Sequence, residues 1–128
     1  MRCSTRNAPG VHELAVCQGL MTQVEQIARR EHAARVTRIL LRIGPLSGVE
    51  PQLLSDAFPI AAAGSVAADA ELAIEPQPIR VRCLTCGEES AASTNRLVCG
   101  ACGDYRTQLL SGDELLLASL ELERRDNV

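Results

Sequence analysis

The sequence predicts an α+β fold in which two helices pack on a three-stranded sheet, with a small cysteine module inserted before the last strand. Three observations lead to this prediction. Apolar residues recur at helical spacing in two segments, they alternate with other residues in three more, and two CxxC pairs precede the last alternating segment. The 128 residues suffice for one domain with a small satellite module.

The first helix is predicted to run from His12 to about Glu31. Its apolar residues recur every three or four positions, which places them on one helical face. They are Leu14, Cys17, Leu20, Met21, Val24, Ile27 and Ala28. On that face we expect Cys17 to be a small buried thiol.

The second helix is predicted to begin near Glu50-Pro51, because proline suits the first helical position, and to end at Gly64. Pro59 lies in its interior. A proline there removes one backbone hydrogen bond, so we expect a kink or an early end.

Three segments read as strands. Residues 36–43 place branched side chains on one side and Arg38 and Arg42 on the other. Residues 70–75 alternate until Pro76 and Pro78 end the strand. The last strand, 116–123, is expected to bury one alternating set, namely Leu116, Ala118, Leu120 and Leu122.

The formal net charge of -3 argues against a phosphate-binding surface, because nucleic-acid binders present a basic face. The sequence shows neither a secretory signal nor the run of about 18 apolar residues that a membrane span requires. We therefore expect a cytoplasmic protein without nucleic-acid or membrane partners. In a reducing compartment, paired cysteines favour metal ligation over disulfides.

The CxxC pairs are Cys83 with Cys86 and Cys99 with Cys102, separated by 12 residues. A CxxC turn lets two sulfurs converge on one ion at about 2.3 Å, and two such turns complete the tetrahedral set of a structural zinc site. Such a site has no open position for substrate. We expect nearby arginines to offset its charge: Arg80, Arg82, Arg96 and Arg106.

Two alternatives to a structural zinc site are open. A thiol oxidoreductase would carry one CxxC pair at a helix start in a βαβ unit, whereas this chain has two pairs. A zinc-ribbon module that binds nucleic acid or protein would use exposed aromatic and basic residues, and Phe58 and Tyr105 are the only aromatic ones. No nucleophile–base pair stands out, so no catalytic residue and no enzyme activity are predicted.

Two histidines flank the first predicted helix. His12 and Glu13 stand at its start and by themselves indicate a solvated cap, since acids suit a helix N-terminus. His32 stands at the opposite end, where a positive charge is favourable. Neither histidine would indicate a metal site without further information.

Several motifs together resemble the HypA/HybF family of hydrogenase maturation proteins. They are His12-Glu13-Leu14, residues 43–51 (IGPLSGVEP), the two CxxC pairs, and residues 111–115 (SGDEL). The similarity extends from Val11 to Glu123, nearly the whole chain.

The resemblance implies a nickel metallochaperone that works with a HypB-type GTPase and delivers Ni(II) to the large-subunit precursor of a nickel-iron hydrogenase. Some relatives also serve urease, which adds urease accessory proteins as partners. The implied nickel ligands are the His12 side chain and the Glu13 backbone, with Glu50 as a nearby carboxylate. Nitrogen donors in a plane suit Ni(II), whereas the four sulfurs suit resident Zn(II).

The sequence departs from the family at its start. Val11 stands where the family has its initiator methionine, and ten residues precede it. A chain beginning at Met1 would lack the terminal amine as a nickel ligand, whereas a chain whose start is read from a valine codon at position 11 would have it. The sequence leaves both starts open. The expected division is an extension (1–11), a nickel-binding α+β domain (12–78 and 111–123), a zinc module (79–110) and a frayed tail (124–128).

Overall fold

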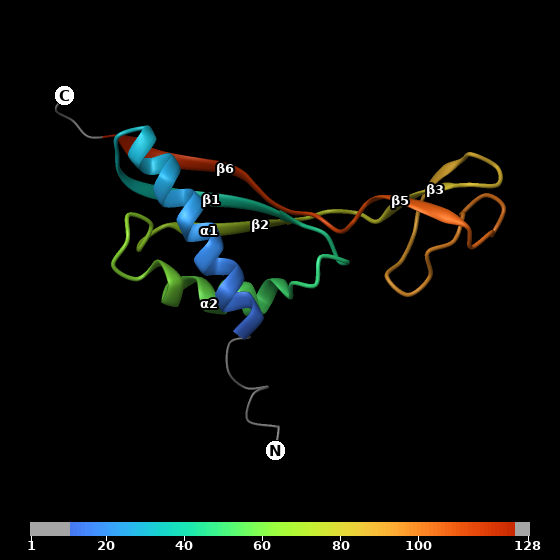
Figure 1. The fold of residues 1–128 in the computed structure, drawn as a ribbon, viewed down its shortest axis with the longest axis horizontal. Coiled ribbons are helices and arrows are strands. Elements are labelled where there is room, and N and C mark those ends of the chain that lie inside the picture. The colour runs from blue at the N-terminus through green and yellow to red at the C-terminus, as the bar shows by residue number, and fades with distance from the viewer. Residues whose placement is uncertain (1–10, 125–128) are drawn as a thin grey trace, which may run out of the picture. The chain divides into compact units, whose positions relative to one another are not determined.

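The computed structural model describes residues 11–124, which form two helices and two three-stranded sheets (Figure 1). Cys3 and nearly all of the expected N-terminal extension lie outside the described residues, as does the tail beyond Arg124. Neither helix is long and apolar enough to cross a membrane.

Helix α1 spans Val11–Arg30 and confirms the first predicted helix. Its buried residues lie on the expected face: Cys17, Leu20, Met21, Val24 and Ala28. Helix α1 packs against helix α2, which spans Pro51–Ala62 and buries Leu54, Ala57, Phe58 and Ala62. The predicted apolar faces therefore meet each other.

The start of α2 is as predicted, but its end differs. Glu50 is the N-cap, and its Oε1 accepts a hydrogen bond from the backbone N–H of Gln52 at 3.0 Å. The helix continues past Pro59 to Ala62 and ends two residues before Gly64, which has a φ of 75°. Pro59 lies in the last turn of the helix. Its missing N–H costs one helical hydrogen bond there, and the helix still continues to Ala62.

The first sheet has the order β2-β1-β6. Strand β1 (Ala33–Ile43) is central, between β2 (Glu71–Pro76) and β6 (Leu115–Arg124). Ile39, Leu41 and Ile43 on β1 are buried. With α1 and α2 beside this sheet, the predicted α+β class is confirmed (Figure 1).

The strand limits differ from prediction in several places. Strand β1 begins three residues before Val36, and β6 reaches Arg124. Strand β2 includes Pro76, because an edge strand tolerates a residue without an N–H. The expected burial of the alternating set on β6 is wrong, because Leu116 is 51% exposed and Ala118, Leu120 and Leu122 are only half-buried.

A second sheet, with the order β4-β3-β5, carries the cysteine pairs and was not predicted. Strand β3 (Arg80–Cys83) pairs antiparallel with β4 (Glu89–Ala91) and with β5 (Thr107–Ser111). Strands of three to five residues are too short to show a reliable alternation. The sequence therefore revealed the CxxC turns but not the strands that support them.

Contacts within the chain define two compact units. The first comprises the described residues up to Leu41, Val49–Ile74 and the described residues from Leu117; the second comprises Arg42–Gly48 and Glu75–Leu116. Their assignment as nickel- and zinc-binding domains stays a prediction.

Within the second unit, the IGPLSG and SGDEL motifs contact each other. The N–H of Gly44 donates to the Glu114 carbonyl at 2.9 Å, and that of Leu46 donates to the Gly112 carbonyl at 2.7 Å. A Cβ atom on Gly44 would collide with the Gly112 carbonyl, so glycine is required there. The two motifs therefore form one backbone junction.

Candidate metal centre

The first CxxC pair forms a tight turn at the end of β3. The N–H of Cys83 donates to the Glu88 carbonyl at 2.9 Å, and the N–H of Gly87 donates to the Cys83 carbonyl at 3.0 Å. Gly87 has a φ of 81°, a conformation that glycine adopts without strain. The Sγ of Cys83 accepts the N–H groups of Thr85 and Cys86, each at 3.3 Å. We call residues 83–88 the first knuckle.

The second CxxC pair repeats this arrangement in residues 99–104, the second knuckle. The N–H of Cys99 donates to the Asp104 carbonyl at 2.9 Å, and Gly103, with a φ of 79°, donates to the Cys99 carbonyl at 2.9 Å. The Sγ of Cys99 accepts the N–H groups of Ala101 and Cys102, each at 3.3 Å. Both knuckles therefore orient their first sulfur by the same backbone geometry.

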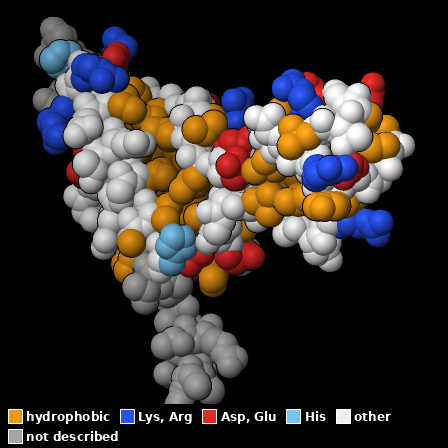
Figure 2. Space-filling model, turned by 45° about the vertical axis from the view of Figure 1, so that its right-hand side comes forward, with side chains coloured by type: hydrophobic (Ala, Val, Ile, Leu, Met, Phe, Trp, Pro, Cys, Tyr) orange, Lys and Arg blue, Asp and Glu red, His pale blue; other side chains and the backbone are white. Residues whose placement is uncertain are grey.

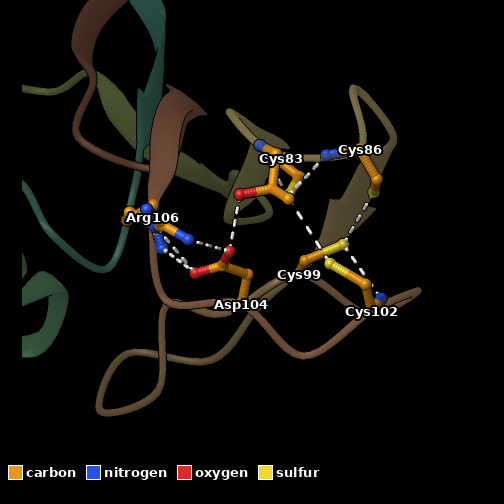
Figure 3. Close-up of polar contacts among 7 residues, drawn as sticks. Cys83, Cys86, Cys99, Cys102, Asp104 and Arg106 are labelled. Carbon is orange, nitrogen blue, oxygen red and sulfur yellow. Dashed lines mark hydrogen bonds and ion pairs between the residues drawn. The ribbon is translucent and has the colours of Figure 1, made fainter.

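The four sulfurs converge on one point (Figure 3). All four Sγ atoms lie within 4.8 Å of one another, with the Cys83–Cys102 and Cys86–Cys99 sulfur pairs each 3.7 Å apart. Cys83 and Cys99 are 2% exposed, whereas Cys86 and Cys102 are on the surface. In residues 11–124, no other group of three or more potential ligands is this close.

The surroundings of the sulfurs favour thiolates at two of the four positions. The N–H of Cys86 and then that of Thr85 lower the pKa of Cys83 to about 6, and the N–H groups of Cys102 and Ala101 lower the pKa of Cys99. The Glu88 backbone lowers the pKa of Cys86, yet burial and the neighbouring sulfurs together raise it to about 12. A divalent ion would remove this conflict, because its charge allows all four thiolates to coexist.

Four cysteine sulfurs in this arrangement fit structural Zn(II), which takes four-coordinate thiolate sites at hydrogen-bonded knuckles. The arginines expected to offset the site's charge are only partly available for that role. Arg82 pairs with Glu89 at 2.6 Å, and Arg106 pairs with Asp104 at 3.1 Å.

Asp104 is a residue of this centre that sequence reasoning missed. Its carboxylate accepts a hydrogen bond from the Thr85 hydroxyl. It also accepts hydrogen bonds from Arg106 (Figure 3). Arg106 and then Thr85 hold the pKa of the Asp104 carboxyl well below its usual range. Nothing in the spacing of acidic residues indicates this role, because Glu88 and Glu89 stand equally near a CxxC pair.

The expected nickel residues lie at the start of α1 and of α2. His12 is exposed in the first turn of α1. Glu13 is 6% exposed, and its Oε2 accepts the N–H of Glu50 at 3.0 Å. The interpretation of the Glu13 side chain as a solvated cap is therefore wrong, because the carboxylate is used to join the two helix starts. His12, Glu13 and Glu50 do not gather their side-chain ligand atoms into one group.

His32 and Cys17 both lie away from the cysteine cluster. His32 is exposed beyond the end of α1 with a φ of 56°. Burial raises the pKa of the Cys17 thiol to about 11, and its Sγ donates to the Leu54 carbonyl at 3.6 Å. The prediction of a small buried thiol at Cys17 is confirmed.

Comparisons with known proteins agree with this architecture. Residues 11–122 match the family model described as hydrogenase/urease nickel incorporation, metallochaperone, hypA. A hydrogenase maturation factor HypA from Nitrosospira multiformis is 47% identical over 112 residues, which cover 88% of this chain and 97% of that protein. The hydrogenase maturation factor HypA from Aquifex aeolicus is 42% identical, and the alignment covers 88% of this chain and 98% of that protein.

The fold is also similar to solved structures. The solution structure of the Ni metallochaperone HypA from Helicobacter pylori has a TM-score of 0.66 at 26% identity, covering 88% of this chain and 98% of that one. A second HypA solution structure has a TM-score of 0.69 at 26% identity, and the match covers 91% of this chain and 99% of that one. Sequence, fold and the paired cysteine knuckles lead to one conclusion: the chain belongs to the HypA family.

Proposed function

We propose that this protein is a nickel metallochaperone, which binds Ni(II) as cargo and delivers it during maturation of nickel-iron hydrogenase. The observation that carries the proposal is the family match over residues 11–122, together with identities of up to 47% to hydrogenase maturation factors. Nickel is the cargo in this function, and zinc is a resident structural ion.

The zinc ligands in this proposal are Cys83, Cys86, Cys99 and Cys102. Only Ile79, Val81, Cys83 and Cys99 are buried apolar residues in the segment Glu75–Leu116. Since two of these four are themselves proposed ligands, the ion supplies what a hydrophobic core would supply elsewhere. With every position filled by sulfur, the zinc has no site for substrate, and the proposed function assigns it no catalytic step.

The nickel ligands in this proposal are the His12 imidazole and the backbone nitrogen of Glu13, with the Glu50 carboxylate nearby. His12 is exposed, so its imidazole is available to an ion from solution. The Glu13–Glu50 hydrogen bond ties residue 50 to the residue that follows His12. A chain that begins at position 11 would add its terminal amine to these nitrogen donors, and such a set suits Ni(II).

Calorimetric titration with Ni(II) tests this site in four forms of the protein. We expect the chain that begins at position 11 to bind more tightly than the chain from Met1. His12→Ala should abolish specific binding while zinc content and fold stay intact. His32→Ala is the matched control, because it removes the other histidine of the chain and should leave nickel affinity unchanged. Equal affinity in all four forms would contradict the site.

The partners in this proposal are a HypB-type GTPase, the hydrogenase large-subunit precursor and, in organisms with urease, the urease accessory proteins. We propose that delivery takes place in the cytoplasm. Co-purification of tagged protein from nickel-grown and nickel-starved cells tests these partners, with His12→Ala as the control for dependence on nickel. Recovery of neither GTPase nor precursor would contradict the proposed pathway.

Two other functions have less support. On the face shown in Figure 2, arginine and acidic side chains intermingle, whereas a nucleic-acid site would show a continuous basic patch. A thiol oxidoreductase would cycle one cysteine pair, but here four sulfurs share one centre. If zinc protects all four cysteines from alkylation, redox cycling at this centre is excluded.

A further inference from the structure

The two knuckles share a backbone arrangement, but their sequences, CLTCGE and CGACGD, differ at three positions, including the last. Glu88 and Asp104 occupy equivalent positions, since each gives its carbonyl oxygen to the N–H of the first cysteine in its knuckle. The Glu88 carboxylate is exposed and, within the described part of the chain, has neither a hydrogen bond nor an ion pair. The Asp104 side chain is only 14% exposed and is fully engaged. This difference indicates a specific role for Asp104.

The Asp104 carboxylate bridges the two knuckles. Its Oδ2 accepts the hydroxyl of Thr85, which belongs to the first knuckle, at 2.5 Å. Arg106 holds the same carboxylate in place: its backbone N–H donates to Oδ1 at 3.0 Å, and its Nη2 donates to Oδ2 at 3.1 Å. The Asp104 side chain of the second knuckle is thus oriented by Arg106 (Figure 3). It is also hydrogen-bonded to the Thr85 side chain of the first knuckle.

Two further hydrogen bonds join the halves that carry the knuckles. The N–H of Leu84 donates to the Arg106 carbonyl at 2.9 Å, and the N–H of Gly100 donates to the Ser90 hydroxyl at 2.9 Å. None of these contacts uses a cysteine. The first and second knuckles are therefore connected by protein contacts in addition to any shared ion.

Such contacts would affect how fast an ion leaves. An ion bound by both knuckles dissociates only after the sulfurs of one knuckle have detached from it and moved away. Groups that are tethered close together keep a high effective concentration for rebinding. A hydrogen bond between the knuckles therefore favours religation over escape.

We propose that Thr85, Asp104 and Arg106 form a lock between the knuckles that slows release of the zinc ion, with Asp104 as the positioning residue. This inference rests on the proposed zinc site. It concerns the retention of resident zinc and is independent of the nickel ligands. Loss of the charge-assisted bonds of Asp104 should speed zinc transfer about tenfold.

The test measures the rate at which an excess of a chromogenic chelator removes zinc from the full chain. Asp104→Ala removes the whole bridge, whereas Thr85→Val removes one hydroxyl without changing charge. Thr85→Ser keeps the hydroxyl and should restore the unaltered rate. Glu88→Ala is the matched control, because it deletes a carboxylate from the equivalent position of the other knuckle.

We expect Asp104→Ala to release zinc about tenfold faster, Thr85→Val to be several-fold faster, and Glu88→Ala to stay within about twofold of the unaltered protein. The double variant should be no faster than Asp104→Ala, because both changes break one bridge. After substitution with Co(II), the sulfur-to-metal charge-transfer band should be the same in all forms, which shows an unchanged ligand set.

Rates for Asp104→Ala and Thr85→Val equal to that of Glu88→Ala would overturn the lock. Slower release from Asp104→Ala would also overturn it, since that result would mean the carboxylate acts through repulsion of the thiolates. Elemental analysis separates this failure from failure of the proposed function. Absence of zinc from the unaltered protein would contradict the zinc site itself.

Discussion

The cysteine centre and the start of α1, the two regions that we propose bind metal, differ in how their potential ligands are arranged. In the cysteine centre, four sulfurs lie within 4.8 Å of one another, and backbone N–H groups hold the first sulfur of each knuckle. At the start of α1, His12 is exposed, and the Glu13 carboxylate is occupied by the N–H of Glu50. The first region brings four potential ligands together, whereas the second does not gather the side chains of His12, Glu13 and Glu50 into one group.

This difference fits the two roles proposed for the metals. Four sulfurs around one centre suit an ion that stays, because they fill a four-coordinate site and leave no open position. A site with few fixed ligands suits an ion that must leave again. The comparison therefore predicts large effects on folding from changes at the cysteine centre and small ones from changes at His12.

The largest expected effect follows loss of one cysteine ligand. Cys99→Ser should abolish zinc binding and unfold the segment 79–110, because a structural zinc ion contributes about 10–16 kcal/mol at neutral pH. The helices α1 and α2 should persist, since they pack against each other. Elemental analysis measures zinc, and amide spectra report the two regions separately.

Cys17→Ala is the matched control, because Cys17 is a buried cysteine outside the cluster. It should retain one zinc ion per chain and the amide signals of both regions. If Cys99→Ser kept its zinc and its folded module, that result would contradict the large effect on folding that we expect from changes at the cysteine centre. Chelation of zinc from the unaltered protein should have the same result as the Cys99 variant.

An intermediate effect is expected for the buried carboxylate beside His12. Glu13→Ala leaves the Glu50 N–H without its acceptor and should lower the free energy of unfolding of the helical unit by about 1–2 kcal/mol. Glu13→Gln retains an acceptor oxygen and should cost less. Urea unfolding followed by far-ultraviolet circular dichroism measures both variants.

Glu25→Ala is the control for Glu13, because Glu25 is a half-buried acid on the same helix. We expect it to change the free energy of unfolding by no more than about 0.5 kcal/mol. An equally small effect of Glu13→Ala would mean that water replaces the carboxylate at Glu50. In that case the two helix starts are not joined by Glu13.

The smallest expected effect separates the two histidines. His32 has a φ of 56°, where glycine is favoured, so His32→Gly should stabilise the protein by about 0.5–1 kcal/mol. His12→Ala, at an exposed position, should change stability by no more than about 0.5 kcal/mol. Urea midpoints measure both variants, and destabilisation by His32→Gly would show that the imidazole makes a contact worth more than the backbone strain.

Local patterns in the sequence were enough to predict the helices, the central strand and the four-cysteine cluster. Helical spacing located the buried face of α1 and the thiol of Cys17, because that period reflects the geometry of the helix itself. The CxxC spacing predicted converging sulfurs for a similar reason, since a turn of this length brings two side chains together.

Tertiary structure decided what depends on partners distant in the sequence. The Glu13–Glu50 bond joins residues 37 positions apart, and the Thr85–Asp104 bond joins residues 19 apart. The exposure of Leu116 depends on how β6 packs in the fold, and β3 acquires β4 and β5 as neighbours only when the chain folds back. Residue type does not specify such partners, because a carboxylate accepts whichever donor the fold places within hydrogen-bonding distance.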